Sequence, residues 1–555
     1  MNITQKTKTL INEIILSALG KLVADGEIPP EPLPAFSVEV PGNSANGDFS
    51  CNAALVSSKA LKKPPRAVAE LIVDSIDSSG FDKIEIAGPG FINFFVGGKW
   101  FNETVTSVLE TGENYGKSDL GDGKRVLLEF VSANPTGPMH IGNARGGAIG
   151  DCLASLLQFA GFYVEREFYV NDAGNQIEKF GLSLDIRYQQ ELGIDIELPE
   201  EAYKGDDIIE HARAFIEIHG DKYLSVSETE RCNALVEYAL PINIKGLEDD
   251  LGKYNIIYDN WFCESVLHEN GETLKIIELL KSKGHTYEAE GAVWFKASEF
   301  GNDKDIVLVR SNGIPTYIVP DIAYHYNKLV GRGFDIAIDI LGADHHGYIP
   351  RMNAALAALG VDTSRLKAII MQMVRLVRNG EAVKLSKRSG KAITLNSLLD
   401  EVPVDAARFF FNLRDANTHL DFDLDLAIEE TSKNPVYYVQ YAHARICSVI
   451  RRLSDEGIIR KDTSLKFTEP AEFDLIRKLA AFPEEINEAA KNYDPSRITR
   501  YTTETAQLFH KFYDSCRVKG EEEEILQSRL ALMEATGIVI RNALTLMKIT
   551  APEKM

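Results

Sequence analysis

Two short segments, far apart in the chain, carry side chains suited to phosphate chemistry. The first is HIGN at His140–Asn143, which opens a predicted helix after a buried strand and a turn. A helix N-terminus in that position is an anion site, because its free N–H groups and its dipole face the ligand. His140 can donate to an α-phosphate as negative charge develops there. In the competing interpretation, His140 only caps a tightly packed, glycine-rich turn. Three glycines would let phosphate and adenine approach the backbone closely: Gly142, Gly146 and Gly147.

The second segment is VKLSKRSGKAITL, Val383–Leu395, where basic residues crowd a loop that contains glycine and serine. Lysines in such a loop act as point charges on the β- and γ-phosphates, and the candidates are Lys384 and Lys387. Alone, this segment is equally typical of a solvated basic loop. The pair is jointly specific, because the two segments bracket one predicted α/β core. Neither has the spacing of a dinucleotide-binding loop or of a Walker A loop.

The elements that must position these segments form a predicted core of alternating strands and helices. RVLLEFV, beginning at Arg125, is a continuous apolar run typical of a buried strand. Three further segments are candidate strands: Asp305–Arg310, Asp335–Gly342 and Ala368–Val374. We therefore expect a doubly wound, parallel, Rossmann-like sheet within residues 122–405. The acidic stretch of about 176–280 is predicted to be an inserted subdomain, because a structureless loop of that length is improbable.

A different organisation is predicted on either side of this core. Residues 1–115 form a mixed α+β domain, in which KIEIAGPGFINFFV reads as two short strands around a Gly-Pro-Gly turn. Residues 406–555 are almost wholly helical and predict an all-α bundle. Four stretches there carry apolar residues at helical spacing: Tyr437–Arg452, Phe473–Ala490, Pro495–Val518 and Glu522–Leu546.

The composition is that of a globular enzyme, with 45% apolar and 26% charged residues among 555. No apolar run approaches the roughly 18 residues needed to span a bilayer. The six cysteines are scattered singly, which favours reduced thiols in a cytoplasmic protein. The net charge of −22 argues against non-specific nucleic-acid binding. It does not exclude a specific RNA partner met by local basic patches.

The two phosphate segments resemble the HIGH and KMSKS signatures of class I aminoacyl-tRNA synthetases. SANPTGPMHIGN, IVPDIAYH, GADHHGYIPRM and the final PEKM closely resemble the arginyl-tRNA synthetase family, as do the N-terminal GDFSCNAALVSSKALKKPPRAVAE and IAGPGFINF. The resemblance covers essentially the whole chain. The chain departs from the family pattern at Asn143 for histidine, Leu385 for methionine, Arg388 for serine and Lys554 for arginine. An amide can still donate to phosphate, so Asn143 leaves the implied activity in place.

This resemblance implies ATP-dependent activation of L-arginine and its transfer to the 3′ end of tRNA(Arg), with Mg²⁺ accompanying ATP. Adenylate formation in this family usually requires the bound tRNA. The resemblance implies arginine-binding roles for Glu129, Asn134, Glu264, Tyr317, Asp321 and Gln372. It implies ATP-binding roles for Pro135, Thr136, Gly137, His140, Gly142, Asn143, Asp344, His345, Lys384 and Lys387, of which His140, Asn143, Lys384 and Lys387 are the catalytic candidates.

Two points about these residues stay open in the sequence. Tyr317 and Asp321 share a helix face only if their segment is helical, and Pro320 leaves that geometry undecided. Glu264 is almost equally readable as an ordinary salt-bridged acid, and no resident metal site is expected.

For tRNA, the resemblance assigns the anticodon-binding role to the helical domain and contact with the tRNA body to residues 1–115. The candidate basic contacts are Arg445, Arg451, Arg452 and Arg497, and the candidate stacking faces are Tyr437, Tyr438, Tyr441 and Tyr501. By composition alone, a helical bundle with an aromatic core and solvated charges explains the same residues. A cytoplasmic monomer is expected.

Three other functions compete with this interpretation. A class I synthetase for another amino acid, such as cysteine, would be expected to show zinc-binding cysteines, which are absent. A nucleotidyltransferase that makes a small-molecule adenylate leaves the helical C-terminal domain unexplained. A catalytically idle tRNA-binding relative is disfavoured by the intact His140, Lys384 and Lys387.

Overall fold

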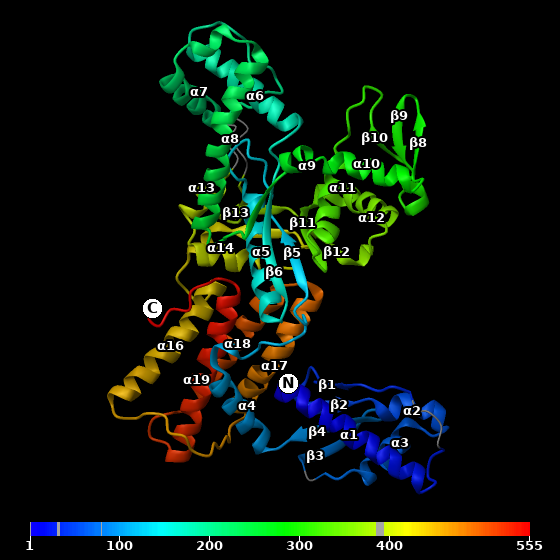
Figure 1. Ribbon diagram of the computed structural model, residues 1–555. Helices are drawn as coiled ribbons and strands as arrows, with labels where there is room; N and C mark the ends of the chain where they lie inside the picture. The colour runs from blue at the N-terminus through cyan, green and yellow to red at the C-terminus, as the bar shows by residue number, and fades with distance from the viewer. Residues whose placement is uncertain (1, 30–33, 79, 384–392) are drawn as a thin grey trace.

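The computed structural model describes residues 2–29, 34–78, 80–383 and 393–555. Figure 1 shows an α/β core in the centre, a bundle of helices in orange and red below it, and an N-terminal unit in blue beside the bundle. Helices in green project from the top of the core. None of the described helices is long and apolar enough to cross a membrane.

The N-terminal unit packs helices against a small antiparallel sheet of strand order β1-β2-β4-β3. The predicted pair of strands is confirmed as the hairpin β3 (Phe81–Ala87) and β4 (Phe91–Val96). Gly90 in its turn has φ +142°, and a Cβ there would lie 2.8 Å from the carbonyl carbon of Pro65, so only glycine fits. The other elements are α1 (Ile3–Ala24), β1 (Val38–Glu39), β2 (Phe49–Cys51), α2 (Ala53–Leu61), α3 (Pro65–Ser75) and α4 (Gly98–Thr111).

The core contains a five-stranded sheet of order β12-β11-β5-β6-β7, in which every neighbouring pair is parallel. The predicted doubly wound fold is therefore confirmed. The order reverses at β5, which lies between β11 and β6, so the crevice beside β5 is the expected ligand site. The elements are β5 (Arg125–Glu129), α5 (Ile141–Phe159), β6 (Tyr163–Val170), β7 (Asn260–Cys263), α11 (Ile318–Tyr326), β11 (Ile336–Gly342), α12 (Tyr348–Leu359) and β12 (Leu366–Met371).

The prediction that Asp305–Arg310 belongs to the parallel sheet is wrong. This segment forms β10 (Ile306–Val309), which pairs antiparallel with β9 in a separate sheet of order β10-β9-β8. β8 (Thr286–Ala289) and β9 (Ala292–Phe295) are joined by two residues with positive φ, the geometry of a tight hairpin turn. Local pairing with this hairpin takes the strand away from the core. The helix α10 (Glu272–Ser282) precedes it.

Three helices form a projecting subdomain with its own apolar cluster: α6 (Asn175–Glu191), α7 (Asp206–His219) and α8 (Glu228–Lys253). β7 follows them and pairs in parallel with β6. The chain therefore returns to the main sheet within the range 176–280 that was predicted as an insertion.

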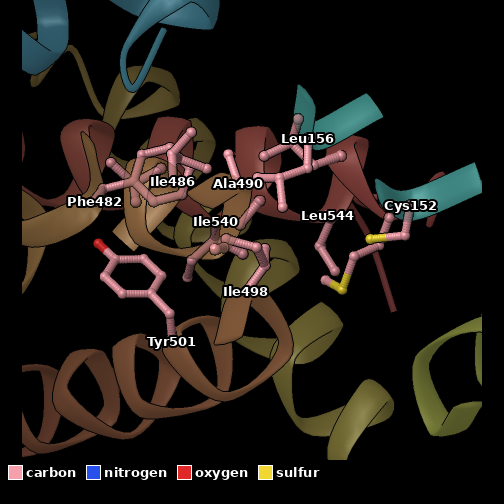
Figure 2. Close-up of a cluster of buried hydrophobic side chains, with 14 of the residues drawn as sticks. Cys152, Leu156, Phe482, Ile486, Ala490, Ile498, Tyr501, Ile540 and Leu544 are labelled. Carbon is pink, nitrogen blue, oxygen red and sulfur yellow. The ribbon is translucent and has the colours of Figure 1, made fainter. Parts of the chain in front are cut away.

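The C-terminal helices predicted from apolar spacing are confirmed: α16 (Pro435–Asp455), α17 (Pro470–Asn492), α18 (Ser496–Ser515) and α19 (Glu523–Leu546). Between them and the core lie β13 (Val374–Arg378), β14 (Glu381–Ala382), α13 (Leu395–Leu399), α14 (Val404–Phe411), β15 (Leu420–Asp423) and α15 (Leu424–Ile428). Figure 2 shows Cys152 and Leu156 of α5 packed among side chains of α17, α18 and α19. The last turns of α5 thus share one core with the bundle.

Candidate active site

The residues predicted to bind substrates lie at the carboxyl-terminal edge of the parallel sheet. Glu129 ends β5, Glu264 directly follows β7, and Gln372 directly follows β12. Asp344 and His345 follow β11 in a short 3₁₀ turn, and both side chains are exposed. Ligands of open α/β sheets bind at this edge, beside the strand where the order reverses. The fold therefore gathers most of the predicted site around β5.

The helix α5 begins at a capping box that orients the two candidate phosphate donors. Nδ1 of His140 accepts the N–H of Gly142 at 3.1 Å, and Oδ1 of Asn143 accepts the N–H of His140 at 3.1 Å. A neutral imidazole that accepts at Nδ1 carries its proton on Nε2. Likewise, an amide that accepts through Oδ1 keeps its Nδ2 hydrogens for donation. The box therefore presents Nε2–H of His140 and the amide group of Asn143 as donors.

The backbone N–H groups of the first turn of α5 have partners inside the protein. Ile141 donates to the carbonyl oxygen of Ile393 at 3.0 Å, and Asn143 donates to that of His140 at 2.9 Å. The expectation that these groups are free to bind an anion is therefore wrong, because the cap and the carbonyl oxygen of Ile393 accept their N–H groups. The donors at this end of α5 are side chains.

The residues that follow the predicted lysine loop lie beside the start of α5. Thr394 forms an isolated β-bridge with His140, next to the hydrogen bond that Ile393 accepts. Lys384 and Lys387 fall outside the described residues, so their positions are not part of this geometry. The bridge connects the two signature segments. The end of Val383–Leu395 therefore lies beside the beginning of His140–Asn143.

The glycines of α5 serve the packing of the helix. A Cβ on Gly147 would lie 2.7 Å from Cδ1 of Ile256, and one on Gly150 would lie 2.3 Å from the Phe130 ring. The prediction that Gly147 admits a ligand is therefore wrong, because that side of the helix faces the protein core. At Gly142 the nearest atom would be 3.5 Å away, which is ordinary contact.

The turn between β5 and α5 lies beneath the inserted helices. Nδ2 of Asn243, from α8, donates to the carbonyl oxygen of Pro135 at 2.9 Å. A Cβ on Gly137 would lie 3.7 Å from a carboxylate oxygen of α7. Pro135 and Thr136 are buried, whereas Asn134 is exposed. The inserted subdomain therefore supports the loop that carries the candidate ATP contacts.

Three carboxylates from separate elements act on the side chain of Tyr169, at the end of β6, and one of them contacts it. Its hydroxyl donates to Oε2 of Glu264 at 2.9 Å. Burial raises the pKa of Tyr169 far above its usual value, and the negative charges of Glu264, Asp321 and Glu129 raise it further. Such a concentration of carboxylates suits a guanidinium, which stays charged and binds oxygens in pairs.

Asp321, at the start of α11, has a pKa well above that of an ordinary aspartate. Burial raises its pKa to about 7, against the opposing charges of His325 and Lys328, and the negative charges of Glu264 and Glu129 add to the increase. The group is therefore only partly ionised near neutral pH. A cation bound beside it would favour the carboxylate and lower that pKa.

Tyr317 and Asp321 lie one turn apart at the start of α11, which answers the question that Pro320 left open. Pro320 is the third residue of the helix, where a backbone N–H has no intrahelical partner, so the helix tolerates proline. Tyr317 is 63% exposed, and the guanidinium of Arg310 lies 5.8 Å from the centre of its ring. The ring is therefore accessible to a ligand.

Sequence reasoning missed a buried cation beneath Glu129. Nζ of Lys328 donates to Oε2 of Glu129 at 2.5 Å and to Oδ1 of Asp339 at 2.7 Å. Oε1 of Glu129 accepts from the hydroxyl of Ser132 at 2.9 Å. Asp339 itself was the available signal, because a charged residue inside an apolar strand is buried only when it is paired.

The backbone of Gln372 is held by Arg145, a side chain of α5. Arg145 donates to the carbonyl oxygen of Gln372 at 2.8 Å and to that of Asp415 at 3.0 Å. The N–H of Gln372 donates to the carbonyl oxygen of Ala416 at 2.9 Å. Burial lowers the pKa of Arg145 to about 10. These contacts fix the backbone of Gln372 relative to α5.

The candidate tRNA contacts differ in how free their charges are. The guanidinium of Arg445 donates to the hydroxyl of Tyr441 at 2.6 Å. Arg497 pairs with Glu485 at 2.8 Å, and Arg451 pairs with Glu553 at 3.4 Å. Arg452 is exposed and forms no ion pair with any residue that the structure describes. Arg452 is therefore the least engaged of the four.

The candidate stacking tyrosines also separate into two groups. The rings of Tyr437 and Tyr441 stack on each other along α16, with centroids 6.3 Å apart and planes 8° apart. Tyr501 is 1% exposed and donates to the carbonyl oxygen of Lys478. The expectation that Tyr501 offers a stacking face is wrong, because its ring belongs to the core shown in Figure 2.

Three known families match successive parts of the chain. "Arginyl tRNA synthetase N terminal domain" matches residues 9–96. "tRNA synthetases class I (R), catalytic domain" matches residues 104–449, which is more than half of the chain. "DALR anticodon binding domain" matches residues 439–555.

Full-length relatives agree with these matches. "Arginine--tRNA ligase" of Caldanaerobacter subterraneus subsp. tengcongensis is 53% identical, with all of both chains covered. The chain belongs to the arginyl-tRNA synthetase family. The "Arginine--tRNA ligase" of Bacillus subtilis, another relative, is 45% identical, again with all of both chains covered.

Solved arginyl-tRNA synthetase structures share the fold of this chain. That of Thermus thermophilus has a TM-score of 0.75 at 20% identity, covering 99% of this chain and 100% of its own. That of Plasmodium falciparum has a TM-score of 0.75 at 19% identity, covering 99% of each chain. At these identities the likeness concerns the fold.

Proposed function

We propose that this protein joins L-arginine to the 3′ end of tRNA(Arg), using the carboxyl-terminal edge of its parallel sheet as the active site. The arginine carboxylate attacks the α-phosphate of ATP, giving arginyl-adenylate and releasing pyrophosphate. The terminal adenosine of the tRNA then attacks the adenylate, giving arginyl-tRNA and AMP. One observation carries the assignment of the site: Glu129 and Glu264 lie at the carboxyl-terminal edge of the sheet where α5 begins, and together with Asp321 they place three negative charges near Tyr169.

The proposed catalysis is electrostatic and positional. Nε2–H of His140 and the amide of Asn143 donate to oxygens of the α-phosphate as charge develops on them, while the capping box holds both side chains in place. Lys384 and Lys387 neutralise the leaving pyrophosphate, a role that rests on the signature and not on the described geometry. Mg²⁺ enters with the phosphates of ATP as part of the substrate. The remaining proposed ATP contacts are Pro135, Thr136, Gly137, Gly142, Asp344 and His345.

Arginine is recognised through charge. Asp321 and Glu264 face the guanidinium, because the negative charges of both act on Tyr169 and the hydroxyl of Tyr169 donates to Glu264. Glu129 completes the acidic lining, and the exposed Tyr317 covers the side chain of the substrate. Asn134 and Gln372 contact the α-amino and carboxylate groups or the ribose.

The tRNA is proposed to bind across all three parts of the chain, which acts as a cytoplasmic monomer. The helical domain, 406–555, binds the anticodon, and residues 1–115 contact the tRNA body. The catalytic domain, 122–405, receives the acceptor end. The proposed basic contacts are Arg445, Arg451, Arg452 and Arg497, with Tyr437 and Tyr441 offering stacking faces.

Aminoacylation of total tRNA with each labelled amino acid in turn tests the function. Arginine alone is expected to be transferred. Adenylate formation, measured as the exchange of labelled pyrophosphate into ATP, is expected to need tRNA. Transfer of any other amino acid would overturn the substrate assignment. Full exchange without tRNA would overturn the proposed order of binding.

A further inference from the structure

Three carboxylates lie side by side across the centre of the parallel sheet. Glu129 of β5 is the register partner of Asp339 on β11 and of Glu167 on β6. Neighbouring strands are only about 4.8 Å apart, so like charges in register repel one another strongly unless cations separate them. Glu129 is the one of the three that is proposed to meet the substrate.

Two cations neutralise this row of carboxylates. Glu167 pairs with Arg332 and accepts from the hydroxyl of Tyr324 at 2.7 Å. Lys328 lies between Glu129 and Asp339, 2.5 Å from Oε2 of the first and 2.7 Å from Oδ1 of the second. The side chain of Lys328 is completely buried. It therefore cannot touch a ligand and acts on the site only through its partners.

One helix face brings Lys328 to this position. Asp321, His325 and Lys328 are spaced i, i+4 and i+7, so they lie on the same side of the segment formed by α11 and the π-helical turn η5 (Asn327–Gly331) that follows it. Nε2 of His325 meets Oδ2 of Asp339 at 2.7 Å. The same face thus carries a proposed arginine contact at one end and the cation beneath Glu129 at the other.

Both oxygens of Glu129 are fixed by the protein. Lys328 holds Oε2, and the hydroxyl of Ser132 donates to Oε1 while accepting the N–H of Tyr169 at 3.1 Å. A carboxylate held at both oxygens keeps one plane and one orientation, which a substrate cation can meet without reordering it. The single ammonium shared by Glu129 and Asp339 also leaves net negative charge for an incoming cation.

We infer that Lys328 is a positioning residue for arginine: it holds the Glu129 carboxylate oriented for the substrate without touching the substrate itself. This inference rests on the proposed function, in which Glu129 lines the arginine pocket. The groups that face Lys328 come from every element around it: Glu129 of β5, Glu167 of β6, Asp339 of β11 and Tyr324 of α11.

A double-mutant cycle in the full-length protein tests the inference. Glu129→Gln and Lys328→Met are each expected to raise the KM for arginine by about tenfold or more, the effect of losing a charge-assisted hydrogen bond. The KM for ATP should stay within about twofold. Because Lys328 acts through Glu129, the double variant should match Glu129→Gln alone, which is the signature of coupled sites.

The outcomes separate the two proposals. If Glu129→Gln leaves the KM for arginine unchanged, the arginine contact of Glu129 fails and the inference fails with it. Three results would overturn only the inference, provided that Glu129→Gln raises the KM for arginine. Lys328→Met could leave that KM unchanged, raise it further in the double variant, or raise the KM for ATP equally.

Two further variants guard against a loss of folding. Lys328→Met leaves Asp339 with His325 alone, so the same cycle in an Asp339→Asn background repeats the test without that buried charge. Arg231→Met is the matched control, because Arg231 is a buried cation paired with Asp185 in the inserted helices. It should lower the melting temperature and leave the KM for arginine unchanged. A similar rise in that KM would mean that general destabilisation explains Lys328→Met.

Discussion

His140 has a capping role and a proposed catalytic role, which use different atoms of one ring. Nδ1 caps α5 by accepting the N–H of Gly142, and this contact leaves Nε2–H of the exposed ring free to donate. The capping interpretation and the catalytic interpretation of HIGN are therefore compatible. The same box holds the amide of Asn143, which explains how asparagine can stand where the family signature has histidine.

Replacing His140 with asparagine should separate these roles. Asparagine is a good N-cap, so the melting temperature of His140→Asn should stay close to that of the parent protein. The donor at Nε2 is lost, and kcat should fall by about 100-fold, the usual effect of removing one transition-state donor. Steady-state aminoacylation and thermal unfolding measure the two effects. A fall in stability with unchanged kcat would leave His140 with the capping role alone.

Asp321 should make arginine binding depend on pH. With a pKa of about 7 in the free protein, it is mostly protonated at pH 6 and mostly ionised at pH 8. Because a guanidinium binds the ionised form, the KM for arginine should fall as pH rises from 6 to 8. Asp321→Asn should have a higher KM for arginine, a nearly unchanged KM for ATP, and a flatter pH dependence. An equal rise in both KM values would contradict the pocket role.

At the scale of elements, α5 connects the site to the rest of the protein. Its first turn carries the donors, its middle packs glycine against Phe130 and Ile256, and its last turns enter the core of the bundle. Sequence periodicity located the helix but not these contacts, because the glycine spacing is the same whether a ligand or a side chain approaches.

Alanine at two helical glycines should therefore have opposite effects. Gly150→Ala places a Cβ 2.3 Å from the Phe130 ring and should lower the free energy of unfolding by about 1–3 kcal/mol. Gly246, inside α8, has nothing within 4 Å of the added Cβ. Gly246→Ala should raise that free energy by about 0.5 kcal/mol or more, because alanine favours the helix. Urea unfolding checks both, and similar values for the two would contradict the packing role.

At the scale of the whole molecule, a buried arginine connects three parts of the chain. Arg408 of α14 donates to Asp151 of α5 at 2.5 Å, to the carbonyl oxygen of Met547 at 2.8 Å and to that of Tyr254 at 3.0 Å. The bundle, the catalytic helix and the end of the insertion thus meet at one guanidinium. Fixed contacts of this kind hold the helical bundle in one position relative to α5 and the parallel sheet.

The bundle arginines should contribute unequally to tRNA binding. Arg452 is exposed with its charge available, whereas Arg497 is already paired with Glu485. Arg452→Ala should raise the KM for tRNA severalfold and reduce the slope of log affinity against log salt by about 1. Arg497→Ala should have a smaller effect on both. Larger effects for Arg497→Ala than for Arg452→Ala would contradict this order. They would mean that the ion pair of Arg497 with Glu485 opens when tRNA binds.

The sequence by itself determined the parts of this protein that depend on neighbours in the chain. The capping pattern at His140, the hairpin around Gly90 and the helices of the bundle follow from local spacing and turn chemistry. The motifs also indicated the family, since their order along the chain is enough to identify it. The alternation of strands and helices predicted the parallel sheet, but it missed β6 and β7 and misplaced β10, which pairs with a local hairpin.

Only the tertiary structure decided which side chains share the site. The sequence prediction of the site did not include Tyr169, Lys328 or Asp339. These residues hold the carboxylates of the proposed arginine pocket in place. Their positions depend on strand register and on the packing of α11 against the sheet, which join residues far apart in the chain. For the same reason Tyr501 belongs to the core and Gly147 faces a side chain. Sequence spacing specifies residue types and local conformation, whereas burial and charge pairing arise when distant strands and helices meet.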